Sequence, residues 1–145
     1  MHYHIYCNLK TMDICHQNAI HEFEKRLSAY CNTTLHLTLS LSFPKDTKEN
    51  NHLFLYISTG PSTYSSEEFA DFLKNIQHSR KSFVHIIIGY SESTLYDALK
   101  ALPDNISPLT LSLTRSSLSY ETITLLFYEQ LYRAHTILQG KTYHK

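Results

Sequence analysis

The strongest constraint on the fold is the alternation of strand-like and helix-like segments along the chain. Apolar and polar residues alternate, or apolar residues run almost continuously, over short segments typical of strands: residues 2–8, 33–42, 52–58, 83–89 and 107–113. Helical spacing occupies the segments between and after them: residues 14–30, 65–80, 93–102 and 119–138. Alternating elements with continuous apolar strands predict an α/β fold, a parallel sheet with helices on both faces.

Size and charge set broad limits on this fold. A chain of 145 residues fits one domain, here 1–145, and can bury a real core. Apolar residues make up 42%, and Gly and Pro number only three and four, which excludes collagen-like and disordered classes. The formal net charge is zero, so contact with RNA has to rest on a local patch.

Cysteine and histidine spacing gives no sign of a disulfide framework or a metal site. Cys7, Cys15 and Cys31 match neither a zinc pattern nor CxxC, and no leader-like or membrane-spanning apolar run is present. We therefore expect a cytoplasmic protein with reduced thiols, no membrane contact and no metal. Structural roles are expected for the histidines of the N-terminal part, since no HExxH motif is present: His2, His4, His16, His21 and His36.

The loops after the later strands are the candidate site. In open parallel sheets ligands bind beyond the carboxyl ends of the strands. Small and polar residues follow Ile57, Ile88 and Leu113, and Gly89 permits a positive φ or a close backbone approach to a ligand. The alternative is that such loops are polar because they turn the chain and cap helices.

The final helix is apolar on more than one side. One stripe is joined by further hydrophobic residues around the helix: Ile123, Phe127, Leu131, Ala134 and Leu138, with Leu125, Leu126, Tyr128 and Tyr132. Either a second subunit in a twofold dimer or the protein's own core covers the second side. Gly140 fits the glycine position that follows a helix end.

The last residues resemble a known family. A helix with the pattern E-(Q/S)-(L/V)-Y-R-A followed by a tail ending in Y-H-(K/R) is typical of the RlmH family of small SPOUT-class methyltransferases. The matching residues are Glu129, Gln130, Leu131, Tyr132, Arg133, Ala134, Tyr143, His144 and Lys145. Similarity covers about the last ninety residues well and the N-terminal strand and helix in outline.

The resemblance implies a Rossmann-like sheet with a C-terminal trefoil knot, a homodimer, and S-adenosylmethionine bound in the knot. Unaided patterning could not predict a knot, because knots are very rare. Carried over residue by residue, the cofactor contacts fall on the three loops named above: Ile57, Gly89, Tyr90, Thr114, Arg115, Ser116, Ser117, Leu118 and Ser119.

The resemblance also implies a reaction, methyl transfer to ring nitrogen 3 of a pseudouridine in large-subunit ribosomal RNA within the assembled ribosome. Arg133 is the candidate for holding a phosphate or the base, against the alternative of a helix-surface ion pair. His144 is the candidate for proton transfer, because an imidazole titrates near neutrality, against the alternative of an ordinary RNA contact. The tail offers cations and aromatic rings for RNA: Lys141, Tyr143, His144 and Lys145.

Three positions depart from the family pattern. Tyr90 replaces the second glycine of the family's turn and is expected to crowd the cofactor with its ring. The family's P-H-x-x-x-R stretch aligns with Ser119, Tyr120 and Thr124, so its histidine and arginine are missing. The segment 43–51 is also shorter than in relatives. These departures keep a second hypothesis open, a non-enzymatic dimeric homologue that binds RNA or ribosomes.

Overall fold

The computed structural model describes residues 1–143 and has the predicted α/β architecture. Its elements follow in the order β1 (His2–Cys7), α1 (Ile14–Leu27), β2 (Asn32–Leu37), β3 (His52–Thr59), α2 (Ser66–His78), β4 (Phe83–Ile88), α3 (Glu92–Lys100), β5 (Leu109–Thr114) and α4 (Tyr120–Leu138). The five strands form one sheet in the order β2-β1-β4-β3-β5, and every pairing is parallel. All carboxyl ends therefore meet at one edge of the sheet.

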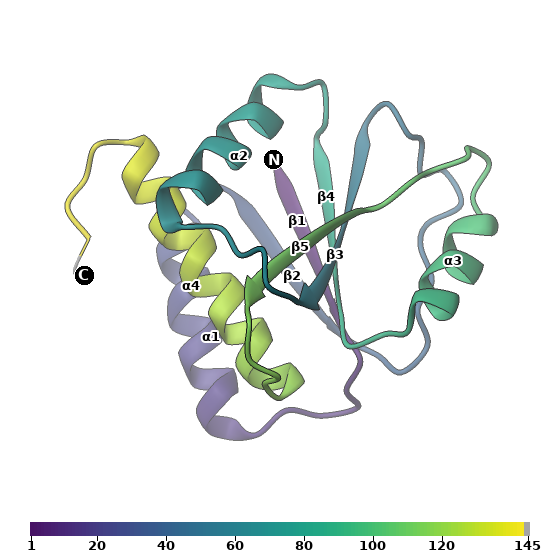
Figure 1. Ribbon diagram of the computed structural model, residues 1–145, viewed down its shortest axis with the longest axis horizontal. Coiled ribbons are helices and arrows are strands. Elements are labelled where there is room, and N and C mark those ends of the chain that lie inside the picture. Colours follow the sequence, from purple (N-terminus) through teal and green to yellow (C-terminus); the bar gives the residue numbers. More distant parts are fainter. Residues whose placement is uncertain (144–145) are drawn as a thin grey trace.

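Helices cover both faces of the sheet, as predicted. Figure 1 shows α1, α2 and α4 together on one side and α3 on the other. The first face buries Ile5 and Ile86 against the three helices. The second face buries Phe54 and Ile87 beneath α3 and the segment 38–51. Neighbouring residues of one strand, such as Ile86 and Ile87, thus enter different cores, as strand alternation requires.

Strand β2 is shorter than the alternating leucines predicted. It ends at Leu37, although the pattern continued to residue 42. The reason is its partner: β2 pairs with β1, and the register ends where Cys7 meets Leu37. Beyond that point Leu41 is buried in the second core while Leu39 is exposed, so the later leucines belong to a loop over the sheet.

The predicted helix boundaries have the expected capping chemistry. Ser65 is the N-cap of α2, and it forms a capping box with Glu68. Gly140 follows α4 with φ +63°, and its backbone N–H donates to the Ile137 oxygen at 2.9 Å. The prediction that Gly140 occupies the glycine position directly after the last helix is confirmed.

Helix α4 lies between α1 and α2, so much of its second apolar side is covered within the chain. Tyr128 is fully buried, and its hydroxyl donates to Glu24 of α1 at 3.0 Å. On the other side Ser66 of α2 donates to Gln130 at 3.2 Å. A central core helix accounts for the burial of Phe127, Tyr128 and Leu131.

The second sheet face carries five histidines on four neighbouring strands: His2, His4, His36, His52 and His85. Nδ1 of His4 lies 3.1 Å from Nε2 of His36, and Nδ1 of His52 lies 2.8 Å from Nε2 of His85. Burial, and then the neighbouring imidazoles, lower the pKa of His85 to about 3 and that of His4 to about 4. These two rings are therefore neutral at pH 7.

Metal clusters and membrane-spanning helices are both absent from residues 1–143. In this part of the chain, no three or more His, Cys, Asp or Glu side chains are placed to hold a metal ion. No helix within the described residues is long and apolar enough to cross a membrane.

Candidate functional site

A cavity of about 610 Å³ opens at the carboxyl edge of the sheet, where the sequence pattern predicted the site. The loops after β3, β4 and β5 form its walls together with the start of α4 and the residue after β1. Its lining residues are Asn8, Tyr56, Ile57, Ser58, Thr59, Ile88, Gly89, Tyr90, Ser91, Thr94, Ser117, Leu118, Tyr120 and Ile123. The volume is in the range of small-molecule sites.

Gly89 forms a sharp turn directly after β4 and lines this cavity. Its φ of +84° lies in the region that favours glycine. A Cβ atom at this position would lie 2.8 Å from the ring of Tyr120. The Asn8 side-chain amide donates to the Gly89 carbonyl oxygen at 3.0 Å and so fixes the turn from the end of β1. The missing side chain thus leaves room for the Tyr120 ring, which packs directly against the turn.

The ring of Tyr90 was expected to crowd the cofactor, but it is buried in the protein core. The side chain is 3% exposed and packs in the second core, on the far side of the sheet from α4. Its hydroxyl donates to the Thr38 carbonyl oxygen, and its own carbonyl oxygen accepts from the Tyr56 hydroxyl at 2.7 Å. The positive φ of Gly89 redirects the chain, so the ring is buried in the second core while the residue still borders the cavity. Tyr120 is the aromatic residue that lies against the turn.

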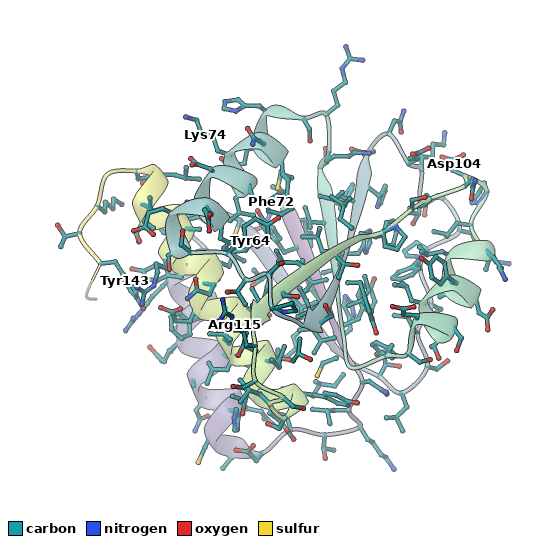
Figure 2. The ribbon with its side chains drawn as sticks, viewed as in Figure 1. Tyr64, Phe72, Lys74, Asp104, Arg115 and Tyr143 are labelled. Atoms are coloured by element: carbon teal, nitrogen blue, oxygen red, sulfur yellow. The ribbon has the colours of Figure 1, made fainter. Side chains whose placement is uncertain are left out.

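The loop between β5 and α4 contributes only part of its predicted residues to the cavity. Ser117 and Leu118 line it, together with the predicted Ile57, Gly89 and Tyr90. The other four predicted residues of the loop lie outside the lining: Thr114, Arg115, Ser116 and Ser119. Figure 2 shows Arg115 on this loop. Ser119 has a different task, because it is the N-cap of α4.

The positions that replace the family's histidine and arginine lie at the start of α4. Thr124 is fully buried; its hydroxyl donates to the Tyr120 carbonyl oxygen at 2.7 Å and lies 3.3 Å from Cys7 Sγ. Burial raises the pKa of the Cys7 thiol, so it stays protonated. Tyr120 is 43% exposed at the cavity. Thr124 therefore anchors the helix to the sheet, and Tyr120 faces the ligand space.

Arg133 and the tail form a second group of residues on the other half of α4. The Arg133 guanidinium pairs with Glu129 at 2.8 Å, the ion pair considered as its alternative role, and also lies 4.9 Å from the Tyr143 ring centre. Lys141 donates to the Tyr30 hydroxyl at 3.2 Å. Arg133, Lys141 and Tyr143 line a cavity of about 390 Å³. Figure 2 shows Tyr143 near the C-terminal end of the chain. His144 and Lys145 lie outside the described residues.

The two cavities are far apart within one chain. Tyr120 borders the first and Arg133 borders the second, and no lining residue is shared between them. Thirteen residues of helix at 1.5 Å per residue separate the two positions by ~20 Å. Within one protomer, Arg133 therefore does not line the cavity at the Gly89 turn.

Sequence reasoning missed part of the cavity lining. Asn8 follows the first strand directly, and the rule that parallel strands end at one edge could have identified it. Thr59 and Ser91 lie in loops that were proposed as a whole, but nothing in the pattern singled them out. The role of Tyr120 against Gly89 depends on where α4 returns to the sheet, which no local pattern reveals.

Comparisons with known proteins agree with this geometry. The sequence model of a family described as "Predicted SPOUT methyltransferase" matches residues 1–144. A Thermoanaerobacter sp. protein named ribosomal RNA large subunit methyltransferase H 1 is 33% identical over 146 residues, which cover all of both chains. A Coprothermobacter proteolyticus protein named ribosomal RNA large subunit methyltransferase H is 32% identical over 127 residues, 87% of this chain and 86% of the relative.

The similarity thus extends over the whole chain, including the N-terminal strand and helix that matched the family only in outline. Full-length matches and the parallel sheet with its carboxyl-edge cavity point to the same family. The chain belongs to the SPOUT methyltransferase family, in its RlmH branch.

Proposed function

We propose that the protein transfers a methyl group from S-adenosylmethionine to ring nitrogen 3 of a pseudouridine in large-subunit (23S) ribosomal RNA. The observation that carries the proposal is the cavity at the Gly89 turn, in a chain similar over its full length to proteins named ribosomal RNA large subunit methyltransferase H. The choice of pseudouridine and of nitrogen 3 follows from the family resemblance.

The residues of the cavity fit S-adenosylmethionine. Gly89 and the Tyr120 ring packed against it line the cavity together, and the cofactor would lie beside both. Ile57, Leu118 and Ile123 offer apolar contacts for the adenine, and Ser91 and Thr59 offer hydroxyl groups for the ribose and amino-acid parts. When bound, the cofactor supplies an activated methyl group on a sulfonium. The predicted contacts of Thr114, Arg115, Ser116 and Ser119 remain proposals.

Arg133 and the tail are proposed to hold the RNA. Arg133 would bind a phosphate or the base, and Lys141 and Tyr143 would contribute charge and a stacking ring. We propose that His144 and Lys145 also contact the RNA, and that His144 is a candidate for proton transfer during the reaction. A local patch suits a protein of zero formal net charge.

A homodimer would unite the two halves of the site. The ~20 Å between Tyr120 and Arg133 along α4 favours a composite site in which the tail of one protomer reaches the cofactor cavity of its partner. We propose this dimer together with the trefoil knot of the family, one methyltransferase domain over 1–145 and a cytoplasmic location, where ribosomal RNA is found.

Cofactor binding is tested by calorimetric titration with S-adenosylmethionine, and methyl transfer by labelled cofactor with isolated large subunits that lack the mark. We expect saturable binding and label in large-subunit RNA, with small subunits as the control. A protein that contacts RNA but shows no cofactor binding at millimolar concentration would instead be the non-enzymatic homologue.

A further inference from the structure

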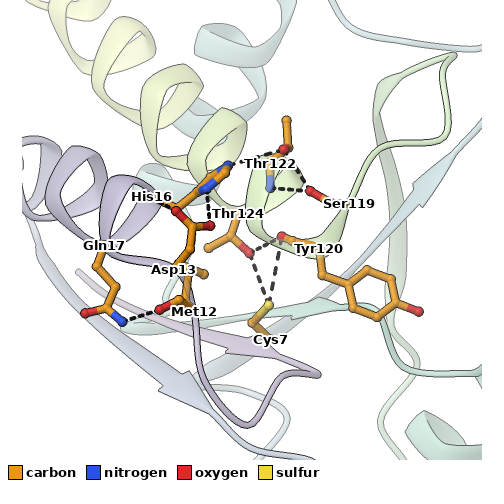
Figure 3. A network of polar contacts seen from close by, with 9 residues as sticks. All are labelled: Cys7, Met12, Asp13, His16, Gln17, Ser119, Tyr120, Thr122 and Thr124. Atoms are coloured by element: carbon orange, nitrogen blue, oxygen red, sulfur yellow. Dashed lines mark hydrogen bonds and ion pairs between the residues drawn. The ribbon is translucent and has the colours of Figure 1, made fainter.

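A chain of hydrogen-bonding side chains joins the start of α1 to the start of α4 (Figure 3). Asp13 is the N-cap of α1: Oδ1 accepts from the backbone N–H of His16 at 3.1 Å, and Oδ2 lies 2.5 Å from His16 Nδ1. Nε2 of His16 lies 3.3 Å from Thr122 Oγ1, which lies 2.8 Å from Ser119 Oγ. The order is carboxylate, imidazole, hydroxyl, hydroxyl.

The carboxylate determines which nitrogen of His16 carries the proton. Hydrogen bonds from the backbone and the ring of His16 lower the pKa of Asp13, so the group is ionised and can only accept. Whenever the ring carries a single proton, Nδ1 must therefore hold it, and Nε2 then presents a lone pair to Thr122. A base held by an orienting carboxylate and facing a hydroxyl is the arrangement that activates hydroxyl groups in enzymes.

With this tautomer the hydrogen bonds of the two hydroxyl groups can run in only one direction. Thr122 donates to His16 Nε2, and Ser119 donates to Thr122. The outer end of this series of hydrogen bonds is thus Ser119 Oγ. This hydroxyl can accept a proton while it donates its own proton to Thr122. Ser119 is exposed and directly follows Ser117 and Leu118, which line the cofactor cavity. Ser119 itself lies outside that lining, so the outer end of the hydrogen-bond chain lies one residue along the sequence from the cavity.

The proposed reaction needs an outlet for one proton, because ring nitrogen 3 of pseudouridine is protonated before transfer. We infer that His16 is the final acceptor of this proton, that Asp13 orients its ring, and that Ser119 and Thr122 carry the proton to it. This assignment rests on the proposed function. His16 acts through the two hydroxyls, on a helix that the family motif does not include.

The step balances in atoms and charge. As nitrogen 3 bonds to the methyl carbon, its N–H bond breaks and the proton passes to Ser119 Oγ. Ser119 gives its proton to Thr122, and Thr122 gives its proton to His16 Nε2. The electron pair of the broken carbon–sulfur bond stays on sulfur, so the positive charge of the sulfonium ends on the imidazolium beside Asp13.

A purely structural tie between α1 and α4 would use the same contacts, so the test has to separate proton acceptance from packing. His16→Gln can keep a hydrogen bond to Thr122 but cannot accept a proton, and His16→Ala removes both. His21 is a matched control on the same helix: its ring is 65% exposed and lies 3.5 Å from Glu24. His21→Ala should leave transfer unchanged.

The measurement is single-turnover methyl transfer by the full-length protein to large subunits at saturating cofactor. We expect His16→Gln and His16→Ala to slow transfer by about 10²-fold at neutral pH, a typical contribution of a general base. The defect should shrink at alkaline pH, where hydroxide replaces the lost base, and added imidazole should restore part of the His16→Ala rate. Cofactor affinity should stay at the wild-type value.

A second measurement is independent of activity. Nitrogen NMR of the free protein should show that the singly protonated form of the His16 ring holds its proton on Nδ1, and Asp13→Asn should remove that preference. A ring protonated on Nε2 would overturn the inference. So would a His16→Gln variant with the wild-type rate, or a defect that neither alkaline pH nor imidazole reduces. Absence of transfer by the wild-type protein would contradict the proposed function itself.

Discussion

Gly89 is the residue at which the cofactor site can be tested most sharply. In Gly89→Ala a Cβ would lie 2.8 Å from the Tyr120 ring at φ +84°. We expect the free energy of unfolding to fall by about 1–2 kcal/mol from the left-handed conformation alone and S-adenosylmethionine binding to be lost. Calorimetry and urea unfolding measure the two effects.

Gly60→Ala is the matched control for this change. Its Cβ would approach only the Ser112 hydroxyl, at 3.0 Å, and that side chain can rotate. Binding should survive in this variant. Wild-type affinity in Gly89→Ala would show that the cofactor binds elsewhere.

Tyr90 tests whether the family departure at the turn matters. Tyr90→Phe removes the hydroxyl that donates to Thr38 while keeping the buried ring. We expect a loss of about 1 kcal/mol in the free energy of unfolding, the usual size for one hydrogen bond, and unchanged cofactor affinity. A marked change in affinity would mean that Tyr90 shapes the ligand space after all.

The direction of the Tyr90 ring also shows what sequence can predict for single residues. The pattern identified Gly89 and its turn correctly, because a glycine directly after a buried strand is typical of a turn with positive φ. It could not give the ring's direction, since the positive φ of Gly89 breaks the alternation that would have placed the next side chain. Tyr120 was noted only as a substituted position, although its ring borders the turn.

At the level of whole elements, the histidine-bearing sheet face predicts acid sensitivity. The pKa of His85 is about 3 and that of His4 about 4 in the folded protein, against about 6.5 for an unfolded chain. Between these values the unfolded chain binds more protons, so stability is complete above about pH 6.5 and declines as pH falls toward 4.

The variant that tests this is His85→Phe. A phenyl ring can stack on Phe54, which lies 4.5 Å from the His85 ring, but it cannot be protonated. We expect urea unfolding of the variant to depend less steeply on pH between about 6.5 and 4 than that of the wild type. His21→Ala, at an exposed position, should leave the slope unchanged. Equal slopes in all three proteins would refute this role of the sheet face.

The elements themselves were largely predictable from sequence. Continuous apolar strands and capped helices identified all nine elements, and the rule for parallel sheets placed the cavity correctly. The pattern failed for residues 38–42, where alternating leucines continued although β1 offered no further partner. Strand length depends on the neighbouring strand, which a local pattern does not contain.

For the molecule as a whole, the separation of the two cavities predicts complementation between subunits. Gly89→Ala should disable the cofactor cavity, and Arg133→Ala should disable the tail patch. If the site is composite, mixed dimers of the two inactive variants contain one intact site and should recover part of the activity. Coexpression with two affinity tags isolates the mixed dimer for a transfer assay.

Two results would contradict this arrangement. An inactive mixed dimer would place both halves of the site in one protomer. A monomer in sizing measurements at micromolar concentration would remove the composite site altogether. The fold of one chain could be predicted from its own sequence pattern, whereas a composite site could not, because the burial of α4 is explained by α1 and α2.

Methylation of a pseudouridine in large-subunit ribosomal RNA can be measured by mass spectrometry of that RNA from cells lacking the protein. We expect that one methylated pseudouridine is lost, that the wild-type protein restores it, and that the Arg133→Ala variant does not. A methyl mark that persists at full level without the protein would contradict the proposed function.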